Sequence, residues 1–375
     1  MKKNNYVIEF IGMGSKKYGG FERYIVEEAK QLKALGYKLV VVFDREPIKT
    51  QYLSDLNFFG VKIEILPYTG FLEFSKGVIS ILRKYHPMVV HTNFSSQVLQ
   101  ILPISMLFRV KRVIATEHCY PIINTLRLHL LYQWIAFFSH NILAVSKRSS
   151  ESIKHGIFFR KKNVNALYLG VKDFHYDKKE AMMHYGINET KVAIMNVAYH
   201  NPVKGVDVLL NAVHILVHKM GVKNFTVYQI GGGQTGKDSN LLYNMAKSLN
   251  IEDYVVWMGL QNNVPEILSA GDIYVQPSRS EGIPLSIMEA SLASLPTVAT
   301  FVGGIPEAAN PCCNGILVAP DSPLVLAEAI KRLIEDGELR KNMGENARQL
   351  AIEKFSLEKQ VGLLITKYYK IQNEF

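Results

Sequence analysis

The stretch over 272–307 constrains the fold of this chain more than any other. It begins with a short apolar run, 272–275, whose length and β-branched content are typical of a buried strand. After a loop, a helix is predicted over 285–292, because Pro284 favours a first helical turn and apolar residues continue at helical spacing. Residues 297–302 are predicted as the next buried strand. Such a unit belongs to a parallel sheet, where ligands bind beyond the carboxyl ends of the strands.

Two carboxylates lie in this unit, Glu281 in the loop and Glu289 in the helix. The N-terminus of a helix presents unpaired backbone N–H groups, so Ile283, Pro284 and Leu285 are candidates to hold a phosphate. Glu289 could then accept hydrogen bonds from a ribose diol, while Glu281 would reach a sugar on the far side of the phosphates. The alternative is that both are solvated surface carboxylates, which is the usual situation of glutamate.

Length and the order of the predicted elements indicate two domains of α/β class. A chain of 375 residues is long for one domain and comfortable for two. Predicted strands alternate with predicted helices, which favours doubly wound parallel sheets. We predict a first domain over 1–172, completed by a C-terminal helix at 356–375. A linker at 173–190 and a second domain over 191–355 complete the expected organisation.

The residues around the two carboxylates resemble the motifs of a known family. Glu281 and Glu289 are separated by seven residues, the dipeptide Pro-Ser at 277–278 precedes them, and GGIPE follows at 303–307. This combination resembles the donor-site signature of retaining glycosyltransferases of family 4, the glycosyl transferases group 1. The resemblance implies the GT-B fold, in which two Rossmann-like domains face each other across a cleft. It also implies that Glu281 orients the transferred sugar and that Glu289 binds the ribose.

The resemblance extends to the N-terminal half of the chain at two places. Gly19 and Gly20 stand between a predicted strand and a predicted helix, where the family has a glycine loop near the donor phosphates and the acceptor. Glycine permits close approach of the backbone there. His118 follows a predicted strand, at the place of a family histidine that points at the transferred sugar, and His91 has a similar setting with a weaker claim. The alternatives are an ordinary strand-to-helix turn and a structural histidine.

In the C-terminal half, the resemblance assigns the donor diphosphate to a lysine and a glycine loop. Lys204 matches the lysine of a motif in which Arg and Lys clamp the diphosphate, with an ordinary surface lysine as the alternative. The chain departs from the motif at Tyr199, which occupies the arginine position, and a phenol supplies no guanidinium charge. Gly232 and Gly233 follow a predicted strand and would let the backbone approach the donor.

Neither a metal site nor a resident cofactor is expected. The chain has three cysteines without the spacing of metal ligands, and it contains no D-x-D. The charge of a leaving diphosphate would therefore be met by Lys204 and by helix N-termini. A UDP- or GDP-sugar would serve as the donor substrate, and Glu281, His118 and Lys204 would carry the catalysis.

A net charge of +10 indicates an anionic partner, which could be a nucleotide, a nucleic acid or a membrane surface. No nucleic-acid-binding motif accompanies the charge, so no nucleic-acid partner is expected. The segment 147–162 holds six Lys and Arg against one Glu, and a second basic cluster lies at 109–112. A basic surface with exposed aromatics suits anionic lipid headgroups, whereas the alternative is a solvated basic face with buried aromatics. The apolar residues within the first segment are Ile153, Ile157, Phe158 and Phe159.

The sequence shows no convincing secretory signal or transmembrane helix, which favours a cytoplasmic protein that could bind peripherally to the inner membrane face. The resulting prediction is a retaining glycosyltransferase of hexosyltransferase type. It would move a sugar from a nucleotide-diphospho-sugar to a saccharide or lipid-linked saccharide in cell-surface polysaccharide biosynthesis. Two alternatives are a sugar-nucleotide epimerase of the same architecture and a non-catalytic nucleotide-sugar binding module. The carboxylate pair with Lys204 argues against the epimerase, whereas Tyr199 keeps the binding module open.

Overall fold

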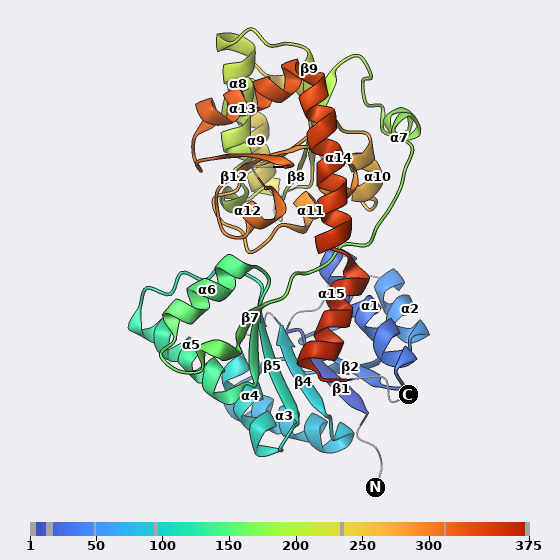
Figure 1. Cartoon of the computed structure of the whole chain (residues 1–375), viewed down its shortest axis with the longest axis vertical. Helices are drawn as coiled ribbons and strands as arrows, with labels where there is room; N and C mark the ends of the chain where they lie inside the picture. The colour runs from blue at the N-terminus through green and yellow to red at the C-terminus, as the bar shows by residue number, and fades with distance from the viewer. Residues whose placement is uncertain are drawn as a thin grey trace. The chain divides into compact units, whose positions relative to one another are not determined.

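The computed structural model describes residues 5–12, 18–48, 50–93, 97–232, 236–310 and 313–371 (Figure 1). The chain forms two compact units, one from Met1–Gly170 with Leu357–Phe375 and the other from Val171–Ser356. Each unit contains one parallel sheet with helices between successive strands. The predicted α/β class with two doubly wound domains is therefore confirmed.

The first unit contains a seven-stranded sheet in the order β3-β2-β1-β4-β5-β6-β7. Its strand order reverses between β1 and β4, as in dinucleotide-binding folds, and ligands of such sheets bind near this reversal. The strands are β1 (Tyr6–Phe10), β2 (Lys38–Phe43), β3 (Lys62–Ile65), β4 (Val89–Asn93), β5 (Arg112–Glu117), β6 (Asn141–Ala144) and β7 (Val164–Ala166).

Side chains of β1 alternate between two hydrophobic cores, as expected of a strand with both faces covered. Val7 packs with α1 (Gly20–Ala34), α2 (Thr50–Phe58), α15 (Leu357–Leu363) and the π-helical turn η5 (Leu364–Tyr368). Ile8 packs on the other face with α3 (Phe71–Tyr85), α4 (Val98–Leu107), α5 (Leu126–Phe138) and α6 (Lys147–Gly156). Glu9 is fully buried on the same face as Val7, which is unusual for a carboxylate.

The second unit contains a six-stranded sheet in the order β10-β9-β8-β11-β12-β13, with its reversal between β8 and β11. The strands are β8 (Val192–Val197), β9 (Phe225–Ile230), β10 (Val255–Gly259), β11 (Ile273–Gln276), β12 (Thr297–Thr300) and β13 (Gly315–Val318). The helices are α7 (Lys178–Tyr185), α8 (Val206–His214), α9 (Gly236–Ser248), α10 (Val264–Ser269), α11 (Leu285–Leu292), α12 (Ile305–Ala308), α13 (Pro323–Glu335) and α14 (Gly337–Lys354). The strand–loop–helix–strand unit predicted over 272–307 is present as β11, α11 and β12.

The segment 173–190, predicted as a linker, lies within the second unit. Its helix α7 begins after Asp177, whose carboxylate accepts a hydrogen bond from the Glu180 backbone N–H at 3.0 Å. Lys178 pairs with Asp272 at 2.6 Å, which ties the helix to the start of β11. The linker prediction does not anticipate these contacts, because they join residues that are far apart in the sequence.

Candidate active site

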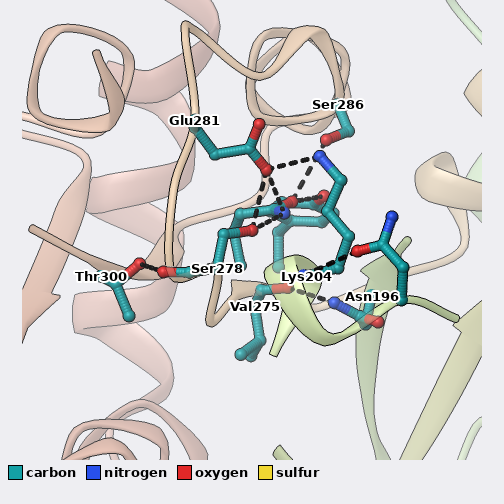
Figure 2. A network of polar contacts seen from close by, with 10 residues as sticks. Asn196, Lys204, Val275, Ser278, Glu281, Ser286 and Thr300 are labelled. Atoms are coloured by element: carbon teal, nitrogen blue, oxygen red, sulfur yellow. Dashed lines mark hydrogen bonds and ion pairs between the residues drawn. The ribbon is translucent and has the colours of Figure 1, made fainter. Parts of the chain in front are cut away.

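The loop between β11 and α11 holds Glu281 next to Lys204 (Figure 2). The Lys204 Nζ atom lies 2.7 Å from Glu281 Oε1, and the two residues are 77 positions apart. Lys204 belongs to a short 3-10 turn, Pro202–Lys204, that follows β8, whereas Glu281 follows β11. These two strands flank the reversal of strand order, so the ion pair lies where ligands of doubly wound sheets bind. Two of the predicted catalytic residues therefore occupy one site.

Three donors converge on Oε1 of Glu281. In addition to Lys204, the Ser278 hydroxyl donates to Oε1 at 2.8 Å and the Gln276 amide donates to it at 3.2 Å. Gln276 can only donate in this direction, because its carbonyl oxygen already accepts hydrogen bonds from Tyr274 at 2.6 Å and Ser286 at 3.2 Å. Glu281 is 9% exposed, so its carboxylate is held in one orientation inside the loop. Among the described contacts none occupies Oε2, which leaves that oxygen for a ligand.

Arg279 fastens the same loop to the turn after β8 and was not predicted from the sequence. Its backbone N–H donates to the Val203 carbonyl at 2.8 Å. Its guanidinium binds both carboxylate oxygens of Asp207, at 2.9 and 2.7 Å, and contacts Asp321 at 2.7 Å. A planar guanidinium suits such bidentate pairing. In the sequence, only the position of Arg279 within the loop motif could have indicated a role for it.

Two glycines permit the close approach of the neighbouring loops. Gly303 has a φ of +48°, and a Cβ atom there would lie 1.7 Å from the Glu281 carbonyl oxygen. Gly205 has a φ of +66°, and its Cβ would lie 2.0 Å from the Pro277 carbonyl oxygen. The loops after β8, β11 and β12 therefore pack backbone against backbone around Glu281.

The predicted phosphate-binding residues form the start of α11. Pro284 is the N-cap of this helix, Ile283 and Pro284 are buried, and Leu285 is half-buried. Glu289 is half-buried and follows Leu285 by just over one helical turn. The backbone N–H groups of this first turn, Lys204 and Glu281 belong to neighbouring connections of one sheet, which suits the binding of an anion beside a polar group.

The loop after β8 meets the glycine loop after β9. The His200 backbone N–H donates to the Gly232 carbonyl at 3.1 Å. The His200 ring is buried, and its Nε2 and Nδ1 contact Gln229 at 2.8 Å and Ser239 at 2.7 Å. Gly232 therefore lies beside the segment that carries Tyr199 at the arginine position, whereas Gly233 lies outside the described residues.

In the first unit, the structure brings His118 together with the predicted glycine loop. Gly20 begins α1, and the Gly19 backbone N–H donates to the Glu22 carboxylate at 2.8 Å. The ring of Phe21 packs edge-to-face on His118, with a distance of 5.3 Å between ring centroids. Burial, followed by the neighbouring His91, lowers the pKa of His118, so its imidazole is neutral at pH 7. His91 itself is buried in the polar core of this unit, as expected of a structural histidine.

Two features are absent from the residues that the structure describes. No group of three or more His, Cys, Asp or Glu side chains is arranged to hold a metal ion. Within the same residues, every helix is too short or too polar to span a lipid bilayer.

Comparison with known proteins links the two units to one family. A family model described as Glycosyltransferase Family 4 matches residues 18–173, and one described as Glycosyl transferases group 1 matches residues 177–350. The chain is 29% identical over 220 residues to N-acetyl-alpha-D-glucosaminyl L-malate synthase of Bacillus anthracis, covering 58% of this chain and 56% of that protein. The match thus spans little more than half of that relative's own length.

A second relative and a solved structure match almost the whole chain. UDP-Gal:alpha-D-GlcNAc-diphosphoundecaprenol alpha-1,3-galactosyltransferase of Escherichia coli is 22% identical over 367 residues, 91% of each chain. The crystal structure of Anabaena Alr3699/HepE in complex with UDP superposes with a TM-score of 0.80 at 19% identity, covering 96% of this chain and 99% of that chain. Together with the two family models, these matches show that the chain belongs to the family 4 glycosyltransferases, the glycosyl transferases group 1, and has the GT-B fold.

Proposed function

We propose that this protein transfers a sugar from a nucleotide-diphospho-sugar to a saccharide or lipid-linked saccharide, with retention of configuration at the anomeric carbon. The observation that carries the proposal is the Lys204–Glu281 ion pair beside the first turn of α11. Two comparisons support the choice of substrates. Alr3699/HepE was solved with UDP bound, and the name of the Escherichia coli relative specifies a UDP-sugar donor and a diphosphoundecaprenol-linked acceptor.

Each residue of the candidate site has a place in this reaction. The donor diphosphate would bind at Ile283, Pro284 and Leu285, where the backbone N–H groups of Ile283 and Leu285 can donate and Pro284 shapes the first turn, with Glu289 accepting hydrogen bonds from the ribose. Glu281 would hold the sugar through Oε2. In the transfer, the bond between the anomeric carbon and the diphosphate oxygen breaks, and the acceptor oxygen bonds to the same face of that carbon. A phosphate oxygen of the donor takes the acceptor's proton.

Lys204 would have one partner before the donor binds and another during the reaction. Without a donor its ammonium is paired with Glu281. A bound diphosphate would attract this ammonium, while Ser278 and Gln276 still hold Glu281 Oε1. Lys204 and the helix N-terminus would then stabilise the negative charge of the leaving diphosphate without a metal ion. Transfer should therefore persist in EDTA, and a loss of activity that only manganese or magnesium restores would contradict this part of the proposal.

The test of the proposal is a screen of UDP- and GDP-sugars for binding, followed by transfer assays with saccharide and lipid-linked saccharide acceptors. Glu289→Ala should weaken nucleotide binding by about 1.5–3 kcal/mol, because a charged hydrogen-bond acceptor is lost. Glu328→Ala, which changes an exposed glutamate of α13, is the matched control. An altered sugar nucleotide formed without any acceptor would favour the epimerase, and binding without turnover would favour the non-catalytic module.

We further propose that the first unit binds anionic membranes, where a lipid-linked acceptor would reside. Of the four apolar residues in the basic segment, Phe158 and Phe159 are exposed, whereas Ile153 and Ile157 are buried in the core. The two phenylalanines can therefore contact a membrane. The Phe158 and Phe159 backbone N–H groups both donate to Gln133 of α5, which joins the basic segment to that helix.

The exposed face of α5 extends this apolar surface. Leu126, Leu130, Trp134 and Phe137 recur at helical spacing and are 71%, 60%, 42% and 57% exposed. The Arg160 guanidinium lies 5.2 Å from the Phe137 ring centroid, which places positive charge at the edge of the apolar face. Aromatic and aliphatic side chains bordered by cations suit the interface of an anionic bilayer.

Liposome co-sedimentation tests the membrane proposal. Binding should require anionic lipid, decrease with salt, and weaken when Arg160, Lys161 and Lys162 are changed to Gln. The control replaces three exposed lysines of the second unit, Lys219, Lys223 and Lys247, with Gln and should leave binding unchanged. Equal recovery with neutral and anionic vesicles would contradict electrostatic docking. Absence of binding at low salt would favour a soluble acceptor or a protein partner for this face.

A further inference from the structure

We propose that Asn93 is a positioning residue that fixes which ring nitrogen of His118 carries the proton, and that Glu9 sets the orientation of Asn93. The inference rests on the proposed contact of His118 with the sugar or the acceptor. It concerns a hydrogen-bond chain inside the first unit, which begins in the core and ends at His118. Sequence motifs gave no indication of this chain.

Three neighbouring strands supply the residues of this hydrogen-bond chain. In the register of the sheet, Glu9 of β1 lies opposite His91 of β4, and Asn93 of β4 lies opposite Thr116 of β5. Alternate residues of a strand share a face, so Glu9, His91, Asn93 and Thr116 all lie on the face covered by α1 and η5. His118 follows directly after β5.

The direction of each hydrogen bond determines the state of His118. The Asn93 amide nitrogen Nδ2 donates to Glu9 Oε2, so the amide oxygen Oδ1 faces the other way. That oxygen lies 2.8 Å from His118 Nε2. Because a carbonyl oxygen only accepts, Nε2 must carry the proton and donate it. In the neutral imidazole Nδ1 then has no proton, so it can accept a hydrogen bond from a hydroxyl but cannot donate one.

Glu9 is held so that Oε2 is the oxygen left for Asn93. The His91 Nδ1–H donates to Glu9 Oε1 at 2.7 Å, and the Tyr369 hydroxyl also donates to Oε1. His91 is itself oriented by Thr116, whose hydroxyl lies 2.6 Å from Nε2. The Asn93 amide is therefore oriented by a carboxylate that hydrogen bonds hold in place from two sides.

The protonation of the buried carboxyl groups supports this orientation of Asn93. The titratable groups that face Glu9 are Tyr24 and Glu28 of α1, His91 of β4, and Tyr369. Burial raises the pKa values of both Glu9 and Glu28, that of Glu28 well above its usual range, so the coupled pair retains a proton at neutral pH. A neutral Glu28 can donate to the Tyr369 hydroxyl at 2.8 Å, and Tyr369 can then donate to Glu9. In this arrangement Glu28 carries the proton of the coupled pair, and Glu9 accepts hydrogen bonds at both of its oxygens.

The ring of His118 is also restrained from the side. Phe21 packs on it at an interplanar angle of 85°, which limits rotation of the imidazole about its own axis. The hydrogen bond to Asn93 fixes the remaining choice, namely which nitrogen is protonated. His118 is therefore pre-organised as a hydrogen-bond acceptor before any ligand binds.

The decisive measurement is the tautomer of His118 in the ligand-free protein. Nitrogen-15 NMR of histidine-labelled protein distinguishes the two protonated nitrogens, and His118→Gln assigns the signal. The parent should show the Nε2–H form. Asn93→Leu removes the acceptor, so the signal should move towards a mixture of tautomers. Asn93→Asp keeps an oxygen facing Nε2 and should restore the Nε2–H form.

Transfer kinetics provide the second readout. Asn93→Leu should lower kcat/KM by about tenfold, the effect of losing one oriented hydrogen bond, and Asn93→Asp should recover most of it. Gln100→Leu is the matched control, because Gln100 is a buried amide of the same unit that binds the Phe71 carbonyl instead. It should change neither the tautomer nor kcat/KM by more than about twofold.

The outcomes separate this inference from the proposed function. An Nδ1–H signal in the parent, or an unchanged Nε2–H signal in folded Asn93→Leu, would overturn the positioning role whatever the activity. A shifted tautomer with unchanged transfer would instead overturn the proposed role of His118 in the reaction. Loss of transfer together with the tautomer shift, reversed in Asn93→Asp, would support both.

Discussion

The two units each bury a glutamate in a polar network, and the two networks balance charge in different ways. Glu281 in the second unit is paired with a lysine and accepts two further hydrogen bonds at the same oxygen. Glu9 in the first unit faces a second carboxyl, a neutral histidine and a tyrosine. Charge is neutralised by an ammonium in one network and by retained protons in the other.

The difference separates a group that can meet a ligand from one that positions its neighbours. The side chain of Lys204 is 27% exposed, so solvent and ligands reach the ion pair. Glu9 and Glu28 are both fully buried, and Glu9 uses both of its oxygens within the core. A cation beside a carboxylate preserves its charge for binding, whereas burial without a cation keeps protons in place and makes the group part of the framework.

The largest effect is expected from removing Lys204, the cation of the network in the second unit. Lys204→Ala should lower kcat/KM on the order of a hundredfold, because it removes a cation from the leaving diphosphate and leaves Glu281 without its ion-pair partner. Steady-state kinetics with saturating acceptor measure this effect, and Lys219→Ala is an exposed control in the same unit.

A double-mutant cycle adds a check on the same pair. If Lys204 and Glu281 act as one unit, Lys204→Ala combined with Glu281→Gln should cost much less than the product of the two single effects. Additive losses would show that the ion pair in the ligand-free site has no bearing on catalysis.

The network around Glu9 and Glu28 should make the free energy of unfolding depend on pH. The pKa of Glu28 is raised by folding, so its contribution to stability is complete below the unfolded-state pKa and is lost as the pH rises. As the pH rises above the unfolded-state pKa, the free energy of unfolding of the parent should fall more steeply than that of Glu28→Gln, by up to about 1.4 kcal/mol per pH unit. Urea unfolding at several pH values measures this slope.

The control for that experiment is Glu73→Gln, which changes an exposed glutamate of α3 in the same unit. Its slope should equal that of the parent. Equal slopes for the parent and Glu28→Gln would mean that Glu28 is already ionised at pH 7, and the contrast between the two networks would disappear.

A smaller effect is expected at the residue that fastens the Glu281 loop. Arg279→Lys keeps the charge but loses the bidentate contact with Asp207, and its partners are partly exposed. The free energy of unfolding should decrease by about 1 kcal/mol or less, and the donor KM should rise by about threefold. Arg332→Lys on the exposed surface of α13 is the control. A larger loss than that of Lys204→Ala would indicate that Arg279 contacts the donor itself.

Local patterns predicted the strand–loop–helix unit and both of its carboxylates, because helix starts, buried strands and turn residues act over a few positions. The family motif assigned Lys204 and Glu281 to one donor site, but their ion pair was not predicted, since no local rule joins residues 77 positions apart. Arg279 escaped because its partners lie on other elements. The roles of the candidate residues in binding and catalysis remain predictions.

Glu9 illustrates most clearly why part of the structure could not be predicted. It occupies the strand Tyr6–Phe10, whose other members are apolar, so the pattern indicates a buried strand but gives its single charge no partner. The Tyr369 hydroxyl that binds it lies 360 positions away. A carboxylate at an inward position of a central strand was the one available signal, and it indicates a buried polar network without identifying its members.

The division of the chain has a consequence for the order in which the protein can fold during synthesis. The second unit is continuous, whereas the first needs Leu357–Phe375 in addition to its N-terminal part. When residue 356 leaves the ribosome, the second unit has all its residues, but Glu9 and Glu28 still lack Tyr369, and the apolar face of α1 still lacks α15. Domains usually complete their folding from the N-terminus onwards. In this protein the half that is made first is the half that is finished last.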